Sequence, residues 1–119
     1  MNNLMKPIEV VEGFFSAMNN GDFASAKKFM ADNHWYTGPM FSTKNPEDYF
    51  KELSAFEMQF EVETQDMIVA NDAITHISLL KIVAPFQKVI PCCEVFNIKE
   101  GKIARQRFYF DTRLFPETS

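Results

Sequence analysis

A histidine in the middle of an apolar segment is the residue of this sequence best suited to acid–base chemistry. His76 lies in the long, mostly apolar run 73–83, which is typical of a buried strand. Imidazole titrates near neutral pH, so His76 could take up or release a proton during a reaction. Ser78 follows two residues later and therefore shares the same face of a strand. The two interpretations are a catalytic histidine and a hydrogen-bonded histidine of the core.

Two carboxylates are further candidates, because a carboxyl group in an apolar cavity has a pKa that moves toward neutrality. Asp111 ends the last segment with strand character. Alternation places it on the outside with Arg107, as a strand-end residue, unless a local bulge turns it inward. Glu94 lies opposite Arg107 in the expected pairing and is interpreted as one half of an ion pair. We therefore take His76 and Asp111 as the catalytic candidates, and alternation points no carboxylate inward.

Other residues are candidates for lining an apolar pocket. The aromatic segment 34–37 predicts a short strand at the mouth of such a pocket. If Trp35 and Thr37 face inward, the Trp35 ring offers a flat wall to a ring-shaped ligand, and core packing is the alternative. From the sheet we expect four further lining residues, Ser78, Gln106, Phe108 and Phe110.

The sequence carries no signal for a metal or a cofactor. His34 and His76 are the two histidines, and they have no spacing that suggests a metal site. Cys92 and Cys93 are adjacent, so in a strand they point to opposite faces and cannot easily form an ordinary disulfide. We interpret both as reduced packing residues. A glycine-rich phosphate loop and a Ser-His-Asp order are also missing, so we expect no metal and no cofactor.

The inward or outward direction of these side chains depends on two turns, since turn positions fix strand register. Glu100-Gly101 predicts a two-residue hairpin turn, and Pro85-Phe86 is expected to close the preceding hairpin. Counting from these turns sorts the strand residues into two faces, of which the charged one is assigned to the outside. The inner face then carries His76, Ser78, Leu80, Cys93, Val95, Gln106, Phe108 and Phe110, and the outer face carries Thr75, Ile77, Leu79, Cys92, Glu94, Phe96, Arg105, Arg107, Tyr109 and Asp111.

The outer face assigned in this way contains a large apolar patch. Patches of this kind usually mark an interface, so we expect a homodimer through the outer face of the sheet. The apolar members of the patch are Ile77, Leu79, Phe96 and Tyr109.

Three helical segments precede the strands. The first begins at Pro7, where the missing N–H costs nothing, and it ends at Asn20-Gly21. Asp22 is a natural cap for the second segment, and Asn45-Pro46 opens the third. Helices followed by a run of strands indicate an α+β fold.

Length, composition and the N-terminal pattern together predict a small cytoplasmic domain with a core or a cavity rich in aromatic rings. The chain of 119 residues fits one domain, expected over 1–119, and 13 phenylalanines can line a core or a cavity. The net charge of −4 disfavours nucleic acids and acidic membranes as partners. The N-terminal segment lacks a signal-peptide pattern, and no apolar run approaches the roughly 20 residues of a membrane span.

Several motifs, taken together, match a known group of proteins. They are the first helix ending in Asn20-Gly21-Asp22, a short strand closing at Gly38-Pro39, the third helix, the hairpin 95–103 and the ending Arg107-Phe108-Tyr109-Phe110-Asp111. In these features the chain resembles the SnoaL-like branch of the nuclear transport factor 2-like superfamily, which is related to the cystatin-like fold. The resemblance implies a cone-shaped, curved antiparallel or mixed sheet wrapped around three N-terminal helices that close one end of a pocket, commonly in a dimer.

The resemblance leaves two classes of function open, because the branch includes polyketide cyclases, ketosteroid isomerases, limonene epoxide hydrolases and non-catalytic members. The epoxide hydrolases carry an Asp in an Arg-Asp-Tyr-Phe-Asp stretch of the last strand, and Phe108 stands at that position here. Ser78 and Leu80 stand near the positions of their Arg and second Asp, so epoxide hydrolysis by that mechanism is not expected. We expect either a cyclase- or isomerase-type enzyme that moves protons on an apolar small molecule, or a non-catalytic ligand-binding or dimerisation module.

Overall fold

The computed structural model describes residues 5–115, so the outer ends of the expected domain, 1–4 and 116–119, lie outside the described residues. Three helices precede a set of long strands, in the order that the sequence patterns predicted. The elements are α1 (Pro7–Asn19), α2 (Phe23–Lys27), β1 (Met30–Thr37), β2 (Ser42–Thr43), α3 (Pro46–Ala55), β3 (Gln59–Ala70), β4 (Ala73–Ala84), β5 (Lys88–Lys99), β6 (Lys102–Phe110) and the short 3₁₀ helix η1 (Thr112–Leu114).

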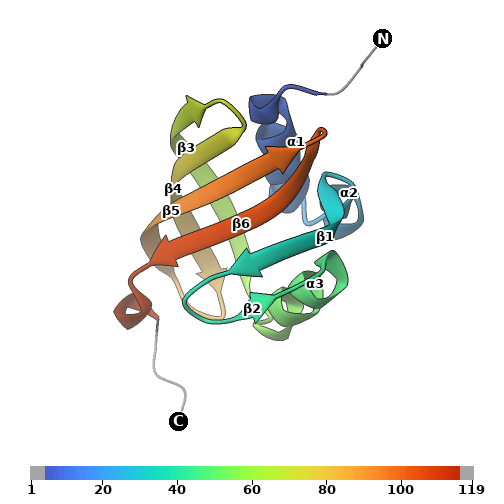
Figure 1. Ribbon diagram of the computed structural model, residues 1–119. Coiled ribbons are helices and arrows are strands. Elements are labelled where there is room, and N and C mark those ends of the chain that lie inside the picture. Colours follow the sequence, from blue (N-terminus) through green and yellow to red (C-terminus); the bar gives the residue numbers. More distant parts are fainter. Residues whose placement is uncertain (1–4, 116–119) are drawn as a thin grey trace.

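The strands form one curved sheet in the order β2-β1-β6-β5-β4-β3. β1 and β6 run parallel, whereas the other neighbouring strands are antiparallel. Figure 1 shows the helices behind the strands β5, β6 and β1, in the space that the curved sheet partly encloses. The α+β class and a curved mixed sheet around three helices are therefore confirmed.

Side-chain caps start the second and third helices where the sequence placed them. The Asp22 carboxylate accepts the backbone N–H of Ser25 at 3.0 Å, at the start of α2. The Asn45 side chain accepts the backbone N–H of Asp48 at 2.8 Å, at the start of α3. These bonds satisfy N–H groups that have no partner within the helix. The cap at Asn45 fixes the entry of α3, which carries two side chains, Tyr49 and Leu53, that line a cavity between the helices and the sheet.

The last hairpin has the predicted turn, but the pairing of its two strands shifts by one residue a short distance beyond the turn. Glu100 and Gly101 both have positive φ values, +53° and +75°, as a two-residue turn of this kind requires. Beyond the turn, β6 contains a bulge, so that Asn97 lies opposite Arg105 rather than Ala104. Because side chains alternate between faces, one extra residue reverses which side chains of the two strands share a face.

The hairpin between β4 and β5 also differs from the expected register. Residues 83–87 separate the last pair, Ile82 and Lys88, so the predicted two-residue turn at Pro85-Phe86 is wrong. With both deviations, the side chains of β4 and β6 point to the faces that the sequence predicted. The side chains of β5 point to the opposite faces from those predicted.

The reversal of β5 exchanges its inner and outer residues. Cys92, Glu94 and Phe96, which the sequence placed outside, are buried on the inner face. Cys93 and Val95, which it placed inside, lie on the outer face and are only partly buried. The expected cross-strand pair of Glu94 with Arg107 therefore does not form.

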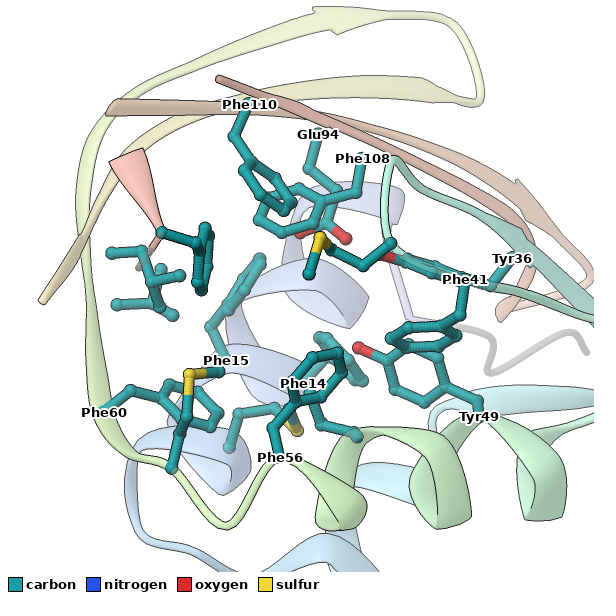
Figure 2. A pocket seen from close by; sticks show the side chains of 17 residues that line it. Phe14, Phe15, Tyr36, Phe41, Tyr49, Phe56, Phe60, Glu94, Phe108 and Phe110 are labelled. Atoms are coloured by element: carbon teal, nitrogen blue, oxygen red, sulfur yellow. The ribbon is translucent and has the colours of Figure 1, made fainter. Parts of the chain in front are cut away.

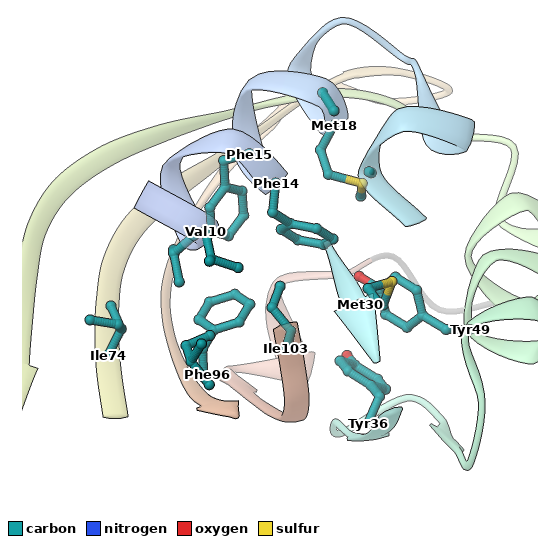
Figure 3. Close-up of a cluster of buried hydrophobic side chains, with 14 residues drawn as sticks. Val10, Phe14, Phe15, Met18, Met30, Tyr36, Tyr49, Ile74, Phe96 and Ile103 are labelled. Carbon is teal, nitrogen blue, oxygen red and sulfur yellow. The ribbon is translucent and has the colours of Figure 1, made fainter. Parts of the chain in front are cut away.

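Phe96 shows what the reversal does to the core. Its ring is fully buried and packs edge-to-face on Phe14 and Phe15, with centroid distances of 5.9 Å and 5.6 Å. Figure 3 shows it beneath α1, close to Val10 and Ile103. Phe96 thus joins the first helix to the middle of the sheet.

Replacing the aromatic anchor of β5 tests this assignment of faces. We expect Phe96→Ala to lower the free energy of unfolding by roughly 3–5 kcal/mol, because it leaves a cavity under α1. Val95→Ala, its matched neighbour on the outer face, is expected to cost about 1 kcal/mol. Urea denaturation of both variants measures the difference, and the opposite order of costs would mean that β5 has the faces predicted from sequence.

Candidate functional site

An apolar cavity lies between the concave face of the sheet and the helices α1 and α3. It encloses about 80 Å³, which is room for several water-sized groups. Figure 2 shows aromatic rings on most sides of it. The residues that line it are Phe14, Phe15, Met18, Tyr36, Met40, Phe41, Tyr49, Leu53, Phe56, Met58, Phe60, Val62, Leu80, Glu94, Phe108, Phe110 and Phe115.

Glu94 is the residue of this lining that carries a carboxyl group. It stands on β5, with His76 of β4 and Phe108 of β6 as its cross-strand neighbours. The side chain is 6% exposed, and its carboxyl group points into the cavity between the rings (Figure 2). The cavity therefore contains the inward carboxyl group that the sequence analysis did not find.

A chain of buried hydrogen bonds holds this carboxyl group. The Gln106 amide nitrogen donates to Glu94 Oε2 at 2.6 Å. The same nitrogen lies 3.4 Å from the Tyr49 hydroxyl oxygen, and Gln106 Oε1 lies 2.9 Å from Nε2 of His34. All four side chains are buried, and they come from β5, β6, α3 and β1 respectively.

Burial sets the protonation of the groups around the cavity. Loss of water around the carboxyl group raises the pKa of Glu94 to about 8, although the hydrogen bond from Gln106 opposes the rise. Burial also raises the pKa values of the Tyr36 and Tyr49 hydroxyls well above their ordinary value, so both remain protonated donors. Burial lowers the pKa of His34 below its usual range, so its imidazole is neutral at neutral pH.

Tyr36 reaches the cavity from β1 because the next turn leaves room for its hydroxyl. A Cβ atom added at Gly38 would overlap the Tyr36 hydroxyl. Glycine at this position therefore permits the close approach of the tyrosine to the chain.

His76 faces inward as predicted but lies outside the cavity lining. Its Nε2 is 2.8 Å from the Thr64 hydroxyl, and its ring stacks on Phe15 with a centroid distance of 4.1 Å. Burial lowers the pKa of His76 to about 4, so the ring is neutral over the physiological range. Ser78 is likewise buried on the inner face without touching the cavity. The geometry favours a packing role for both, and the catalytic role of His76 stays an untested prediction.

β1 contributes to the interior through other residues than the predicted Trp35 and Thr37. Trp35 is 39% exposed and packs under the Arg105 guanidinium on the outer face, 4.3 Å from the ring centroid. Thr37 is also exposed. The inward placement of Trp35 and Thr37 is therefore wrong, because alternation along β1 sends His34 and Tyr36 inward instead.

Asp111 lies past the end of β6 and away from the cavity. Its carboxylate caps η1 by accepting the backbone N–H of Arg113 at 3.0 Å, and it forms an exposed ion pair with the Arg113 side chain at 2.9 Å. The Arg113 side chain holds the pKa of Asp111 below its usual range. The structure thus gives Asp111 the strand-end role, and no bulge turns it inward.

Three of the expected lining residues do belong to the site. Phe108 and Phe110 line the cavity, and Gln106 binds the carboxyl group of Glu94. The residues missed were Glu94, Tyr36, Tyr49 and His34. One sequence signal could have found Glu94: in the run 90–98, Ile90, Cys92, Phe96 and Ile98 share its alternation, which indicates an apolar face.

Within residues 5–115, no group of three His, Cys, Asp or Glu side chains could hold a metal ion. Over the same residues, no helix has the length and apolar character to cross a membrane. Cys92 and Cys93 both carry free thiols, as expected, and burial raises the pKa of the Cys92 thiol to about 12.

The fold and its ring-lined cavity define a member of the nuclear transport factor 2-like superfamily. More closely, residues 5–117 match the family model of the limonene-1,2-epoxide hydrolase catalytic domain, and the chain belongs to this family. Among proteins of curated function, no match was found.

Solved structures confirm the fold. A nuclear transport factor 2-like protein of unknown function from Cytophaga hutchinsonii is 24% identical, with a TM-score of 0.82 over 95% of this chain and 96% of that chain. An epoxide hydrolase of the limonene type from M. tuberculosis is 23% identical, with a TM-score of 0.80 over 91% and 84%. A provisionally assigned polyketide cyclase from Sinorhizobium meliloti is 15% identical, with a TM-score of 0.78 over 88% and 100%.

The raised pKa of Glu94 predicts how stability depends on pH. The folded-state pKa of about 8 lies above the ordinary value of 4.5, so the folded protein holds this proton more tightly than the unfolded chain. The resulting stabilisation is complete below about pH 4.5 and is lost as the pH rises through about 8. Glu94→Gln removes this contribution while keeping the shape of the side chain.

Wild type and Glu94→Gln should therefore diverge with rising pH. We expect the free energy of unfolding of the wild type, relative to Glu94→Gln, to fall by on the order of a few kcal/mol between acid and mildly alkaline pH. Urea denaturation across this range measures the difference. A constant difference between the two proteins would show that Glu94 titrates normally.

Proposed function

We propose that this protein is a small-molecule enzyme that transfers protons on an apolar substrate, with Glu94 as the catalytic base and acid. The observation that carries the proposal is a single carboxyl group, buried and hydrogen-bonded, in a cavity otherwise lined by rings and aliphatic side chains. A pKa near the working pH lets such a group both take up and return a proton.

The substrate class follows from the lining. Ten of the lining residues are Phe or Tyr, which favours flat, apolar molecules. The polar groups that reach the cavity are the Glu94 carboxyl group and the hydroxyls of Tyr36 and Tyr49. A neutral ring compound with one oxygen acceptor, such as a cyclic ketone, would use all of them.

The proton transfer can be written for such a ketone. The carboxylate form of Glu94 takes the proton from the carbon beside the carbonyl, and the electron pair of the broken C–H bond moves to the carbonyl oxygen to give an enolate. Tyr49 receives a hydrogen bond from Gln106, so its own O–H remains free to donate to that oxygen. Glu94 then returns the proton to the same or another carbon, which gives exchange or isomerisation.

A substrate larger than the cavity of about 80 Å³ requires some lining side chains to move. Met40 is the most suitable of them, because it is 45% exposed and methionine side chains adapt easily. We propose that ligands enter beside Met40.

Family membership alone does not carry the epoxide hydrolase activity to this chain. Phe108 stands at the catalytic Asp position of the motif described above and contributes a ring to the cavity. On β4, Ser78 and Leu80 stand near the positions where the epoxide hydrolases carry an Arg and a second Asp. We therefore propose a reaction that needs one carboxyl group rather than the hydrolase set of three residues.

Proton exchange on a test ketone measures this chemistry directly. With β-tetralone in deuterated water, we expect the wild-type protein to accelerate loss of the proton signal beside the carbonyl, measured by proton NMR. The rate should rise with pH and level off above about 8, because the carboxylate is the active form. Glu94→Gln should lower the rate by roughly 100-fold or more while binding of the ketone persists.

His76→Ala is the matched control, because His76 neighbours Glu94 but lies outside the cavity. It should leave the exchange rate unchanged in protein that remains folded. Equal exchange by wild type and Glu94→Gln contradicts the proposed role of Glu94. Binding of the ketone without exchange in the wild type would favour the second function, a non-catalytic ligand-binding module.

We also propose that two copies of the chain associate through the outer face of the sheet. The described helices all pack on the other face, and the outer face presents Ile77, Leu79 and Val95 partly uncovered, with Tyr109 53% exposed. Phe96, which was expected in this patch, is instead in the core. The patch that remains is apolar at its centre, as a dimer interface requires.

Light scattering of the purified protein tests this association. We expect wild type at twice the chain mass, and we expect Ile77→Lys to shift the protein to single chains, because a charge at the centre of the patch would be buried without a partner. Gln59→Lys, at an exposed position of β3, adds the same single charge and should keep twice the chain mass. A wild-type protein of single-chain mass contradicts the proposal.

A further inference from the structure

His34 is a buried histidine that the chemistry proposed above does not use. It is fully buried on β1, packs edge-to-face on Tyr49 with a centroid distance of 5.7 Å, and is linked to Glu94 by hydrogen bonds through Gln106. β6 lies between β1 and β5 in the sheet, so a side chain of β6 can bridge the two strands. Gln106 occupies this position, beside Tyr36 of β1 and opposite Phe96 of β5.

The hydrogen-bond donors and acceptors of this bridge can be assigned from its geometry. The Gln106 carboxamide oxygen carries no proton, so at 2.9 Å it must accept from His34 Nε2. His34 is therefore neutral with its proton on Nε2, and its Nδ1 has no partner among the described residues. The two N–H bonds of Gln106 then point to Glu94 Oε2 and to the Tyr49 hydroxyl oxygen.

The reverse orientation of Gln106 is disfavoured by His34. Turned over, the amide nitrogen would face Nε2 of His34, and the ring proton would have to move to Nδ1. Nδ1 has no partner among the described residues in either case, but it would then carry an N–H, and an orphaned buried N–H is the arrangement that folded proteins tolerate least. His34 thus holds the amide in the orientation that donates to Glu94.

The orientation of Gln106 decides how Glu94 exchanges protons. Because Glu94 Oε2 accepts from the amide, the carboxyl proton resides on Oε1, the oxygen that the amide leaves free. The N–H donor also stabilises the carboxylate. With the amide turned over, its carbonyl would bind the carboxyl proton itself and hold it away from the cavity.

We propose that His34 is a positioning residue for Glu94, acting through Gln106 to direct the exchangeable proton into the cavity. The inference rests on the proposed function for its catalytic meaning, but its physical content concerns Glu94 alone. The other titratable groups that face Glu94 or lie next to it are Tyr36 from β1, Tyr49 from α3, His76 from β4 and Cys92 from β5. All are uncharged while Glu94 titrates, so their charges do not compete with the effect of the amide.

Titration of Glu94 in His34 variants tests the inference without any substrate. The carboxyl carbon of Glu94, labelled with ¹³C and assigned with Glu94→Gln, reports its protonation by NMR. We expect His34→Phe to raise the titration midpoint by about one pH unit, because Gln106 is then free to turn its carbonyl toward Glu94. His34→Gln, whose amide can still donate to Gln106, should restore the wild-type midpoint.

Two further variants separate this mechanism from a general disturbance of the core. His76→Phe replaces the other buried histidine beside Glu94 and should leave the midpoint unchanged. In the Gln106→Leu background, His34→Phe should cause no further shift, because the connecting amide is gone. An unchanged midpoint in His34→Phe, or an equal shift with and without Gln106, would overturn the inference.

The nitrogen spectrum of wild-type His34 gives a second test that does not depend on a variant that folds. We expect ¹⁵N NMR to show a protonated Nε2 and an unprotonated Nδ1, and the opposite tautomer would overturn the inference. Failure of the ketone to exchange would contradict the proposed function while leaving these titrations intact, so the two failures are distinguishable.

Discussion

The cost of placing a carboxyl group in an apolar cavity is the constraint on which the structure of the site depends. Glu94 is surrounded by rings and buried under α1 and α3, and water is largely excluded from it. A carboxylate in such surroundings is tolerated only when donors are supplied and when protonation remains available. Gln106 supplies the donor, and Tyr49 and His34 engage the remaining polar atoms of Gln106.

This requirement connects strands that are distant in sequence. The bonded groups come from β1, α3, β5 and β6, so the site forms only when the parallel pairing of β1 with β6 and the hairpin of β5 with β6 are both in place. The apolar surroundings come from many elements, among them α1 through Phe15 and β3 through Phe60. Folding and the chemistry of the carboxyl group therefore depend on the same contacts.

The fold was predictable from sequence because its signals are local. The capping residues Asp22 and Asn45, the turn at Glu100-Gly101 and the alternation of β3 each act within a few residues. The site was not predictable from sequence, because the residues of β5 that point inward depend on the register of this strand. A bulge in β6 and a connection over residues 83–87 each moved that register by one position, and neither has a strong sequence signal. Asp111, the carboxylate expected from the end of β6, lies away from the cavity, whereas Glu94 lies in it on β5.

The chain thus has the fold of the limonene-1,2-epoxide hydrolase family, and Glu94 is the charged group of its cavity lining. Phe108 of β6 is the cross-strand neighbour of Glu94 and lines the same cavity.

Infrared spectroscopy of the protein at neutral pH tests the central claim most directly. Glu94 is expected to remain largely protonated at this pH, because burial raises its pKa to about 8. The account predicts a carbonyl stretching band of a protonated carboxyl group in the wild type that disappears in Glu94→Gln and fades as the pH rises past this value. A wild-type spectrum without that band would mean that the carboxyl group is ionised in its cavity, and the account would be contradicted.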